Sequence, residues 1–367
     1  MPVPFLDLRR QHEEVASEAL EAVGRVLASG SYVLGREVEA FEAEWAAYCG
    51  VRAAAGVNSG TDALALALLA TGAVRPGAGD EVITSPLSAG YTALAILNAG
   101  GVSVFADVDE STACLNPCAL EPALTPRTRA VVPVHIYGRM ADVEGVRDFA
   151  RRRGLVVVED AAQAHGASLR GVRSGSHGDA AAFSFYPTKN LGAYGDCGAV
   201  TSDDPRVIET VKELRQGGHA AAMRGRMAGR NSRLDELQAA LLRIKLWRLD
   251  EWNRRRREVA ETYRRLLSDA GITLPQPATP ESHVFHLFVV RHTARECLRR
   301  HLCARGVETL VHYPFLLHQQ TLFRSEHQRP LPVAEALARE ILSLPLYPQI
   351  RDEEVREVAA AILDFKG

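Results

Sequence analysis

Short apolar runs alternate with longer Ala- and Leu-rich stretches between about residues 50 and 203. The runs are continuously apolar, as in VSVFADV at 102–108, which predicts strands buried on both faces of a sheet. Stretches of helical length separate them, so we expect α/β units and a largely parallel sheet. The seven predicted strands are 51–57, 81–86, 102–108, 130–136, 155–159, 180–185 and 198–202. Ligands gather at the carboxyl ends of such strands.

The pattern changes after the seventh strand. One long helix is predicted at about 234–268; glutamates surround its arginine run at 254–257, which favours a solvated or interface face over a nucleic-acid patch. An α+β pattern follows, with a strand at 283–291, a helix near 293–305, a strand near 307–312 and two more helices. We therefore predict a large α/β domain at 1–250, whose N-terminal segment can pack with the small one, and a small α+β domain at 251–367.

Composition narrows the class of protein. The 367 residues are 47% hydrophobic with a net charge of −2, so a sizeable core is expected and a basic field for nucleic acid or membrane is not. The apolar runs are too short and too interrupted to span a bilayer, and no signal pattern opens the chain, so we expect a cytoplasmic protein. Cys114 and Cys118 lie close together, but no second pair stands at zinc-ligand spacing, so we expect six reduced thiols and no metal.

Lysine is rare in this chain: of 43 basic residues, 39 are arginines and four are lysines. Lys189 lies among small, aromatic and polar residues in SFYPTKNLG. An amine in a partly desolvated site loses pKa and becomes a nucleophile. Lys212 and Lys245 lie in charged helical stretches and Lys366 at the terminus, so they are read as surface lysines. Lys189 is the candidate nucleophile.

Two further segments carry possible chemistry. Gly60 and Thr61, in NSGTDAL, enter an apolar helix, where free N–H groups and the helix dipole form a phosphate cradle; plain helix capping is the simpler reading of this motif alone. Ser184 offers a further hydroxyl. Asp160 ends the run VVVED, where a carboxylate can meet a cationic ring nitrogen, as in pyridoxal-phosphate enzymes. A solvated strand-end carboxylate or a helix cap explains that segment equally well.

The order of four motifs resembles the DegT/DnrJ/StrS family of sugar aminotransferases. The motifs are NSGTDAL, VEDAAQAHGA, SFYPTKNLGAYGDCGAV and GRNSRLDELQAA, and the similarity runs from PFLDL at 4–8 to SLPLYP at 343–348. The resemblance implies pyridoxal 5'-phosphate (PLP, alternating with its amino form, PMP), fold type I with a mostly parallel seven-stranded sheet, and a homodimer whose active sites are shared between subunits.

The resemblance also assigns roles to individual positions. It makes Lys189 the Schiff-base and proton-transfer residue and pairs Asp160 with the pyridine nitrogen. The other cofactor contacts that it implies are Gly60, Thr61, Ser184, Gln163 (near the ring hydroxyl), and Asn231 from the partner subunit. The positions that it places near the sugar nucleotide are His312, Tyr313 and His318. The family has a stacking aromatic ring where this chain has Ala89, and Tyr91 is the candidate replacement; Cys197 stands where a glycine is usual, and we expect no chemistry from it.

The expected reaction is a ping-pong transamination from L-glutamate to a nucleotide-linked keto-sugar. The strings HLFVVR at 286–291 and HYP at 312–314 resemble the branch that aminates C3 of dTDP-6-deoxyhexoses. Three alternatives remain. The first is a 4-keto-sugar aminotransferase of the same family. The second is a sugar dehydratase of the same fold, which has histidine in place of Lys189. The third is a regulatory protein that binds the cofactor without turnover, although no helix-turn-helix or basic segment is appended.

Overall fold

The computed structural model describes residues 2–218, 228–323 and 329–366. A seven-stranded sheet has the order β1-β9-β8-β5-β4-β2-β3, in which β9 is antiparallel to both neighbours and the other pairs are parallel. Its strands are β1 (Ala53–Val57), β2 (Glu81–Thr84), β3 (Val102–Phe105), β4 (Thr128–Val132), β5 (Val156–Asp160), β8 (Ala180–Ser184) and β9 (Gly198–Ser202). The seven predicted strands are confirmed. β4 ends before Pro133, which has no N–H to continue the ladder.

Alternate residues of the central strands enter different hydrophobic clusters. Val158 and Val132 pack on one face of the sheet, whereas their neighbours Val157 and Val131 pack on the other. This period of two is the strand geometry that the continuously apolar runs predicted. Helices α4 (Gly60–Ala70), α5 (Gly90–Asn98) and α8 (Pro205–Leu214) contribute to the first cluster. The second face is covered by α3 (Arg36–Cys49), α6 (Leu120–Ala123), α7 (Val143–Arg153) and α9 (Glu236–Leu246).

The predicted helix at 234–268 is wrong as a single element. It is broken into α9 and α10 (Leu249–Leu266), with Trp247 between them and 83% exposed. The break lets α9 pack on α2 (Ala16–Ser29) and α3, while α10 packs on α13 (Asp352–Leu363). Arg254 pairs with Glu258 on the helix surface, as expected. Arg256 does not share that solvated face, since it is buried and donates to the carbonyls of Phe285 and Leu346.

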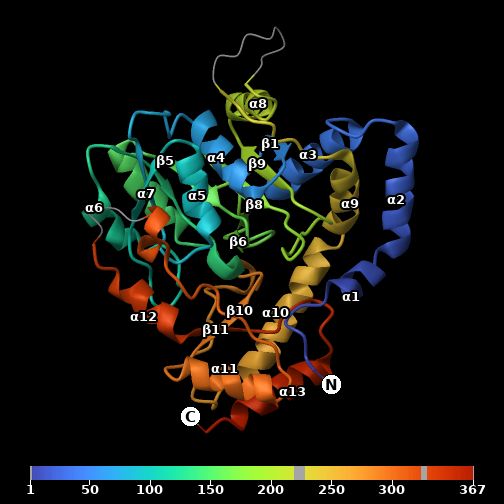
Figure 1. The fold of residues 1–367 in the computed structure, drawn as a ribbon, viewed down its shortest axis with the longest axis vertical. Coiled ribbons are helices and arrows are strands. Elements are labelled where there is room, and N and C mark those ends of the chain that lie inside the picture. The colour runs from blue at the N-terminus through green and yellow to red at the C-terminus, as the bar shows by residue number, and fades with distance from the viewer. Residues whose placement is uncertain (1, 219–227, 324–328, 367) are drawn as a thin grey trace.

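A second, two-stranded sheet pairs β10 (Phe288–Arg291) with β11 (Ile341–Leu344). Helices α11 (Arg295–Ala304), α12 (Pro332–Glu340) and α13 lie with this sheet. Figure 1 shows that it lies at the opposite end of the molecule from α8, together with α11, α13 and both chain ends. The strand predicted near 307–312 is wrong, because Val307 and Leu310 form only isolated bridges, and the pairing segment is β11 instead. A domain boundary at residue 250 stays a prediction.

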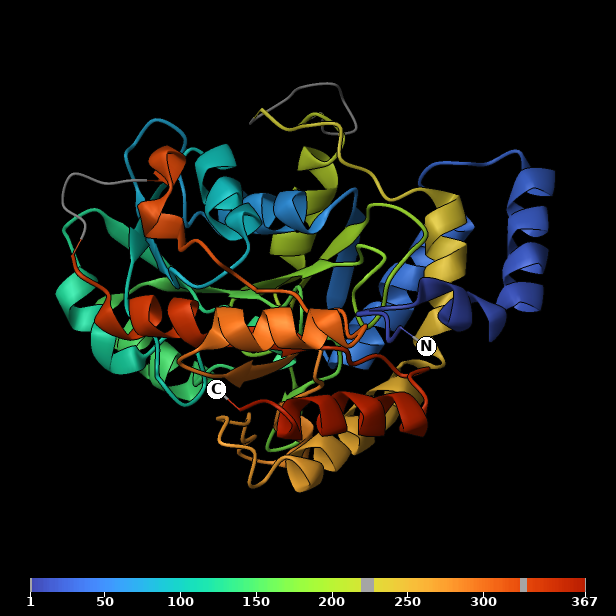
Figure 2. The same cartoon turned by 60° about the horizontal axis from the view of Figure 1, so that its bottom comes forward.

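The N-terminal segment contacts both the C-terminal part of the chain, at Val307, and helix α9. Val3 pairs with Val307, and α1 (Leu8–Glu13) leads to α2, which stands at the side of the molecule against α9 (Figures 1 and 2). Glu236, from the GRNSRLDELQAA motif, is buried and accepts from the backbone N–H groups of Gly35 (2.8 Å) and Val38 (2.8 Å) at the start of α3. This carboxylate therefore caps a helix.

In the described ranges, no helix has the length and apolar character needed to cross a membrane.

Candidate active site

A cavity of about 680 Å³ opens where β1, β5 and β8 end. Such a volume is typical of a site for a small molecule or cofactor. Seven of the eight predicted cofactor residues line it, and so do Ala89 and one of the predicted sugar-site residues, Tyr313; the seven are Gly60, Thr61, Tyr91, Asp160, Gln163, Ser184 and Lys189. Segments far apart in the sequence thus meet at the edge of the sheet at which ligands are expected.

The acidic pair at the end of β5 is divided between the two faces of the sheet. Asp160 lines the cavity and is 8% exposed. Its neighbour Glu159 points the other way, is fully buried, and accepts from His135 Nε2 (2.9 Å) and from the backbone N–H groups of His177 (2.8 Å) and Gly178 (2.9 Å). Burial opposes ionisation of Glu159, but these donors outweigh it and hold its pKa below the usual value. Glu159 fixes a loop, and Asp160 is left for the cavity.

The carboxylate of Asp160 is held by two donors. Thr92 Oγ1 donates to Oδ2 (2.7 Å), and the backbone N–H of Ala162 donates to Oδ1 (3.2 Å). Ser88 Oγ lies 2.7 Å from Thr92 Oγ1. Ser88 and Thr92 line the same cavity, and the sequence reasoning missed both. The available signal was the hydroxyl of Thr92 within the otherwise apolar stretch TALAIL.

Lys189 follows β8 and lines the same cavity as this carboxylate. Loss of hydration on burial lowers the pKa of its amine to about 8, against the opposing attraction of Asp160. At that pKa a substantial fraction of the amine is neutral near pH 7.5, which is what a nucleophile or a base requires. The expected depression of the pKa is therefore present in the structure.

The first turn of α4 forms a narrow cradle with β8. Ser59 caps the helix by accepting from Asp62 N (3.2 Å), and the N–H groups of Gly60 and Thr61, in the first turn, have no intrahelical partners. A Cβ on Gly60 would come within 2.5 Å of Ser184 Cβ, so only glycine lets the helix approach β8 this closely. This cradle suits a phosphate, because it combines the free N–H groups of the first turn of α4, the hydroxyls of Thr61 and Ser184, and the positive end of the helix dipole.

Gln163 is fixed in orientation by two partners. Its Oε1 accepts from the backbone N–H of Tyr137 (2.7 Å), and its Nε2 donates to the hydroxyl of Tyr313 (3.0 Å). One N–H of the amide remains for a ligand. The hydroxyl of Tyr137 donates to His312 O (2.5 Å), which ties the segment containing Tyr313 to the large sheet.

Three predicted site residues do not line this cavity. His312 lies behind it, with Nδ1 2.9 Å from Ser343 Oγ, and burial together with Lys189 lowers its pKa to about 4. His318 is buried against Phe105, with Nε2 3.3 Å from Glu335 Oε1. Asn231 is exposed, and its backbone pairs with Gln216. Their binding roles stay predictions.

The prediction that Lys245 is a surface lysine is wrong, because its side chain is buried. Its amine donates to Gly192 O (2.8 Å) and Gln11 Oε1 (3.2 Å) and lies 4.2 Å from the centroid of the Tyr194 ring. Burial lowers its pKa to about 8. Lys245 lies on the buried face of α9, but the charged residues next to it in the sequence made the position look exposed. Lys245 fixes the loop that follows Lys189.

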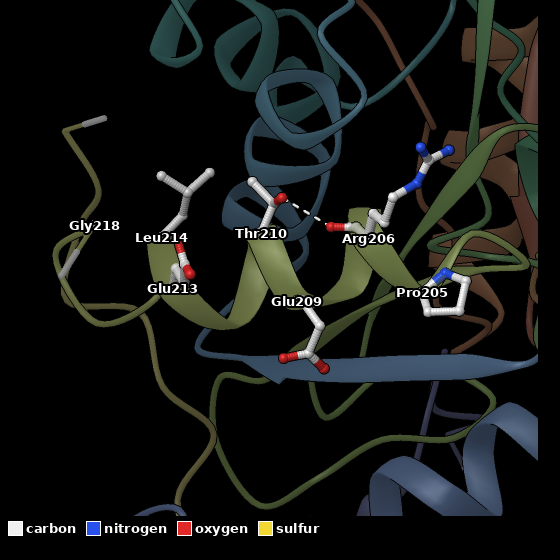
Figure 3. Close-up of a pocket in the computed structure, with 7 residues that line it drawn as sticks. All are labelled: Pro205, Arg206, Glu209, Thr210, Glu213, Leu214 and Gly218. Atoms are coloured by element: carbon white, nitrogen blue, oxygen red, sulfur yellow. Dashed lines mark hydrogen bonds between the residues drawn. The ribbon is translucent and has the colours of Figure 1, made fainter. Parts of the chain in front are cut away.

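The described part of the chain has other hollows, one of them of about 660 Å³ and lined by charged side chains such as Glu144 and Asp148, but no predicted site residue lines that one. A shallow hollow runs along α8 (Figure 3) and is lined by Pro205, Arg206, Glu209, Thr210, Glu213, Leu214 and Gly218. The hydroxyl of Thr210 there donates to Arg206 O (2.8 Å), an ordinary bond within the helix. None of the predicted site residues lines it. Within the described ranges, no group of three or more His, Cys, Asp or Glu residues could hold a metal ion.

Comparisons with known proteins agree with this geometry. The model of the DegT/DnrJ/EryC1/StrS aminotransferase family matches residues 13–363. The chain therefore belongs to that aminotransferase family.

Three relatives are similar over nearly their whole length. The dTDP-3-amino-3,4,6-trideoxy-alpha-D-glucose transaminase of Streptomyces venezuelae is 47% identical over 99% of this chain and 96% of its own. The erythromycin biosynthesis sensory transduction protein EryC1 of Saccharopolyspora erythraea is 47% identical over 99% of both chains. The crystal structure of S. venezuelae DesV in complex with a ketimine intermediate superposes with a TM-score of 0.94 at 47% identity, covering 99% of this chain and 98% of that one. The expected fold type is confirmed.

Proposed function

We propose that this protein is a PLP-dependent aminotransferase that moves an amino group from L-glutamate to the C3 ketone of a dTDP-linked 6-deoxyhexose. The observation that carries the proposal is one cavity with a nucleophilic lysine, a buried carboxylate and a helix N-terminus on its walls. Identity of 47% to a dTDP-3-amino-sugar transaminase supports the choice of substrate class.

The residues of the cavity fit the proposed cofactor. The N-terminus of α4 offers N–H groups and Thr61 Oγ1 to a phosphate, and Gly60 leaves no side chain in the way. Ser184 adds a hydroxyl from the end of β8. Asp160 supplies a negative charge for a protonated ring nitrogen, and the free N–H of Gln163 suits a ring oxygen. The phosphate, the ring nitrogen and a ring oxygen of the cofactor therefore each have a counterpart in the chain.

Bound PLP supplies an electron sink for the bond changes at the amino-bearing carbon. Lys189 would hold the cofactor covalently and, when released, its Nζ would take the proton from the α-carbon of glutamate and pass it to the cofactor. The depressed pKa of about 8 makes that amine a competent base near neutral pH. Lys189 returns a proton to the sugar carbon in the second half of the reaction. Asp160 keeps its negative charge beside the ring throughout.

We further infer a homodimer in which Asn231 of the partner subunit reaches the phosphate. Tyr91 and Tyr186 line the cavity yet are 67% and 50% exposed, so the cavity is open on one side in a single chain. Exposed apolar residues also stand on α2 and beside α9, including Leu20 and Trp247. Large exposed apolar side chains favour a protein partner. A cytoplasmic location belongs to the same proposal, since all six cysteines are free.

A regulatory role without turnover is the second candidate, because the EryC1 relative is named a sensory transduction protein. The two functions differ in the first half of the reaction. A solution of the purified protein with PLP is mixed with glutamate alone, and its visible absorbance is followed. The proposal predicts that the cofactor band is lost and that one 2-oxoglutarate forms per site. A stable band and no keto acid would favour the regulatory function.

A further inference from the structure

Three buried side chains at the back of the cavity form a connected row. Ser88, on the loop after β2, lies beside Thr92 on α5, with 2.7 Å between their hydroxyl oxygens. Thr92 Oγ1 lies 2.7 Å from Asp160 Oδ2. Ser88 and Thr92 are each only 3% exposed, so protein partners and not bulk water satisfy them. The row joins the loop after β2 to the carboxylate at the end of β5.

The direction of the hydrogen bonds follows from the chemistry of the three groups. An ionised carboxylate only accepts, so Thr92 gives its single hydroxyl proton to Asp160 Oδ2. Thr92 then has none left to donate, so Ser88 must donate to Thr92 Oγ1. Each donated bond polarises the next, and the row ends in a donated hydrogen bond to the carboxylate. The N–H of Ala162 donates to Oδ1.

We propose that Thr92, supported by Ser88, is a positioning residue that decides where the proton between Asp160 and the cofactor's ring nitrogen resides. This inference rests on the proposed function, since it requires PLP in the cavity. A proton between a carboxylate and a pyridine nitrogen stays on the nitrogen when the carboxylate is stabilised as an anion. The Thr92 hydroxyl supplies that stabilisation, and it also fixes the orientation of the carboxylate on the wall of the cavity. Without it the proton moves toward Asp160, and the ring loses the charge on which its electron sink depends.

The chain offers a matched control for a buried threonine hydroxyl. Thr84 ends β2, is fully buried, and donates to Val132 O (2.9 Å). Thr84 does not line the cavity. Thr84→Val and Thr92→Val therefore remove the same atom from similar surroundings, but only the second removes it from Asp160. Thr92→Ser keeps the hydroxyl and serves as the conservative variant.

The test uses holoenzyme loaded with PLP that carries ¹⁵N in the ring, and the ring-nitrogen NMR shift reports its protonation directly. We expect wild type, Thr84→Val and Thr92→Ser to show a protonated nitrogen, and Thr92→Val to show the signal moved toward the unprotonated position. Ser88→Ala should move it in the same direction by less. Loss of one hydrogen bond to a charged group should slow the glutamate half-reaction of Thr92→Val about tenfold to a hundredfold, with little change in the glutamate concentration for half-maximal rate.

The outcomes separate this inference from the function on which it rests. A wild-type protein that holds no PLP would overturn the proposed function. A wild-type protein with protonated nitrogen, together with a folded Thr92→Val variant whose signal is unchanged, would overturn the inference alone. Equal displacement in Thr84→Val and Thr92→Val would also overturn it, because the effect would then come from general loosening of the fold. Thermal unfolding of each variant establishes that it is folded.

Discussion

Gln163 and Tyr313 are joined by a hydrogen bond of 3.0 Å although 150 residues separate them in the sequence. Gln163 lies just beyond β5 of the large sheet, and Tyr313 belongs to the segment between α11 and α12. Burial raises the pKa of the Tyr313 hydroxyl to about 12, so it remains protonated and can still donate a hydrogen bond into the cavity. The bond brings the C-terminal part of the chain onto the proposed cofactor site.

Removing that hydroxyl should loosen the cofactor. Tyr313→Phe leaves Gln163 without one partner, and a net hydrogen bond is worth about 0.5–1.5 kcal/mol. We expect PLP affinity of the apoprotein to fall about threefold to tenfold, measured by equilibrium dialysis. Tyr48→Phe is the control, since the Tyr48 hydroxyl donates to Asp250 (2.6 Å) and Tyr48 does not line the cavity. Unchanged affinity in Tyr313→Phe would show that Gln163 needs no support from Tyr313.

Lys189 should be the residue that carries the cofactor, and Lys245 is the sharpest control. Burial lowers both pKa values to about 8, so the pKa alone does not choose between them. Geometry does, because Lys245 is engaged by Gly192 O and Gln11 Oε1 while Lys189 lines the cavity. Borohydride reduction and peptide mapping should find the pyridoxyl group on Lys189. Lys189→Ala should abolish turnover, and a label on Lys245 would contradict the assignment.

Substitution of Asp160 should slow the reaction, whereas substitution of the adjacent Glu159 should lower the free energy of unfolding. Asp160→Asn keeps the size and removes the charge beside the ring, so we expect the protein to fold and the half-reaction with glutamate to slow about 10²- to 10³-fold. Glu159→Gln removes a charge held by His135 and by backbone N–H groups, so we expect a loss of about 1.5–3 kcal/mol in unfolding free energy. Because the pKa of Glu159 is depressed on folding, its contribution exists above the unfolded pKa and is lost as pH falls through the folded one. Near-normal rates in Asp160→Asn would reduce that carboxylate to a structural role.

Asn231 should act on the active site of the other subunit. Its neighbours Arg230 and Ser232 bond to Asp62 (2.7 Å) and Asn58 (2.9 Å) of the same chain, which holds the segment in place while Asn231 itself stays exposed to a partner. Mixing Lys189→Ala protein with Asn231→Asp protein should create heterodimers with one intact site in two, so we expect about half of wild-type activity per heterodimer. Heterodimers verified by mass spectrometry that stay inactive would argue that Asn231 serves its own subunit.

The sheet and the principal residue of the site could be predicted from the sequence, for physical reasons. The sheet was predictable because strands buried on both faces have continuous apolar runs, and Lys189 because lysine is so rare. The break at Trp247 was not, because a helical pattern continues across it and only packing on different partners separates α9 from α10. β11 was missed because its four residues, ILSL, directly follow a helix and read as its continuation.

The side-chain partners of the site were harder to predict than its principal residues. Thr92 and Tyr137 meet Asp160 and Gln163 only in the folded chain. The buried state of Lys245 was hidden because arginines flank it in the sequence while its helix face packs inward. Periodicity identifies which face of an element is buried, but not which distant group a polar atom will find there.

The central claim is amination at C3 of a nucleotide-linked keto-sugar. Shifting the reaction to C4 requires a different presentation of the sugar over one fixed cofactor carbon, at a near-attack distance of about 3–3.5 Å, so a single pocket should favour one ketone. The most direct measurement offers dTDP-3-keto-6-deoxyhexose and dTDP-4-keto-6-deoxyglucose separately, each with glutamate, and locates the new C–N bond by NMR. We predict a 3-amino product and no reaction with the 4-keto compound. Amination at C4, with the 3-keto compound left untouched, would contradict this account.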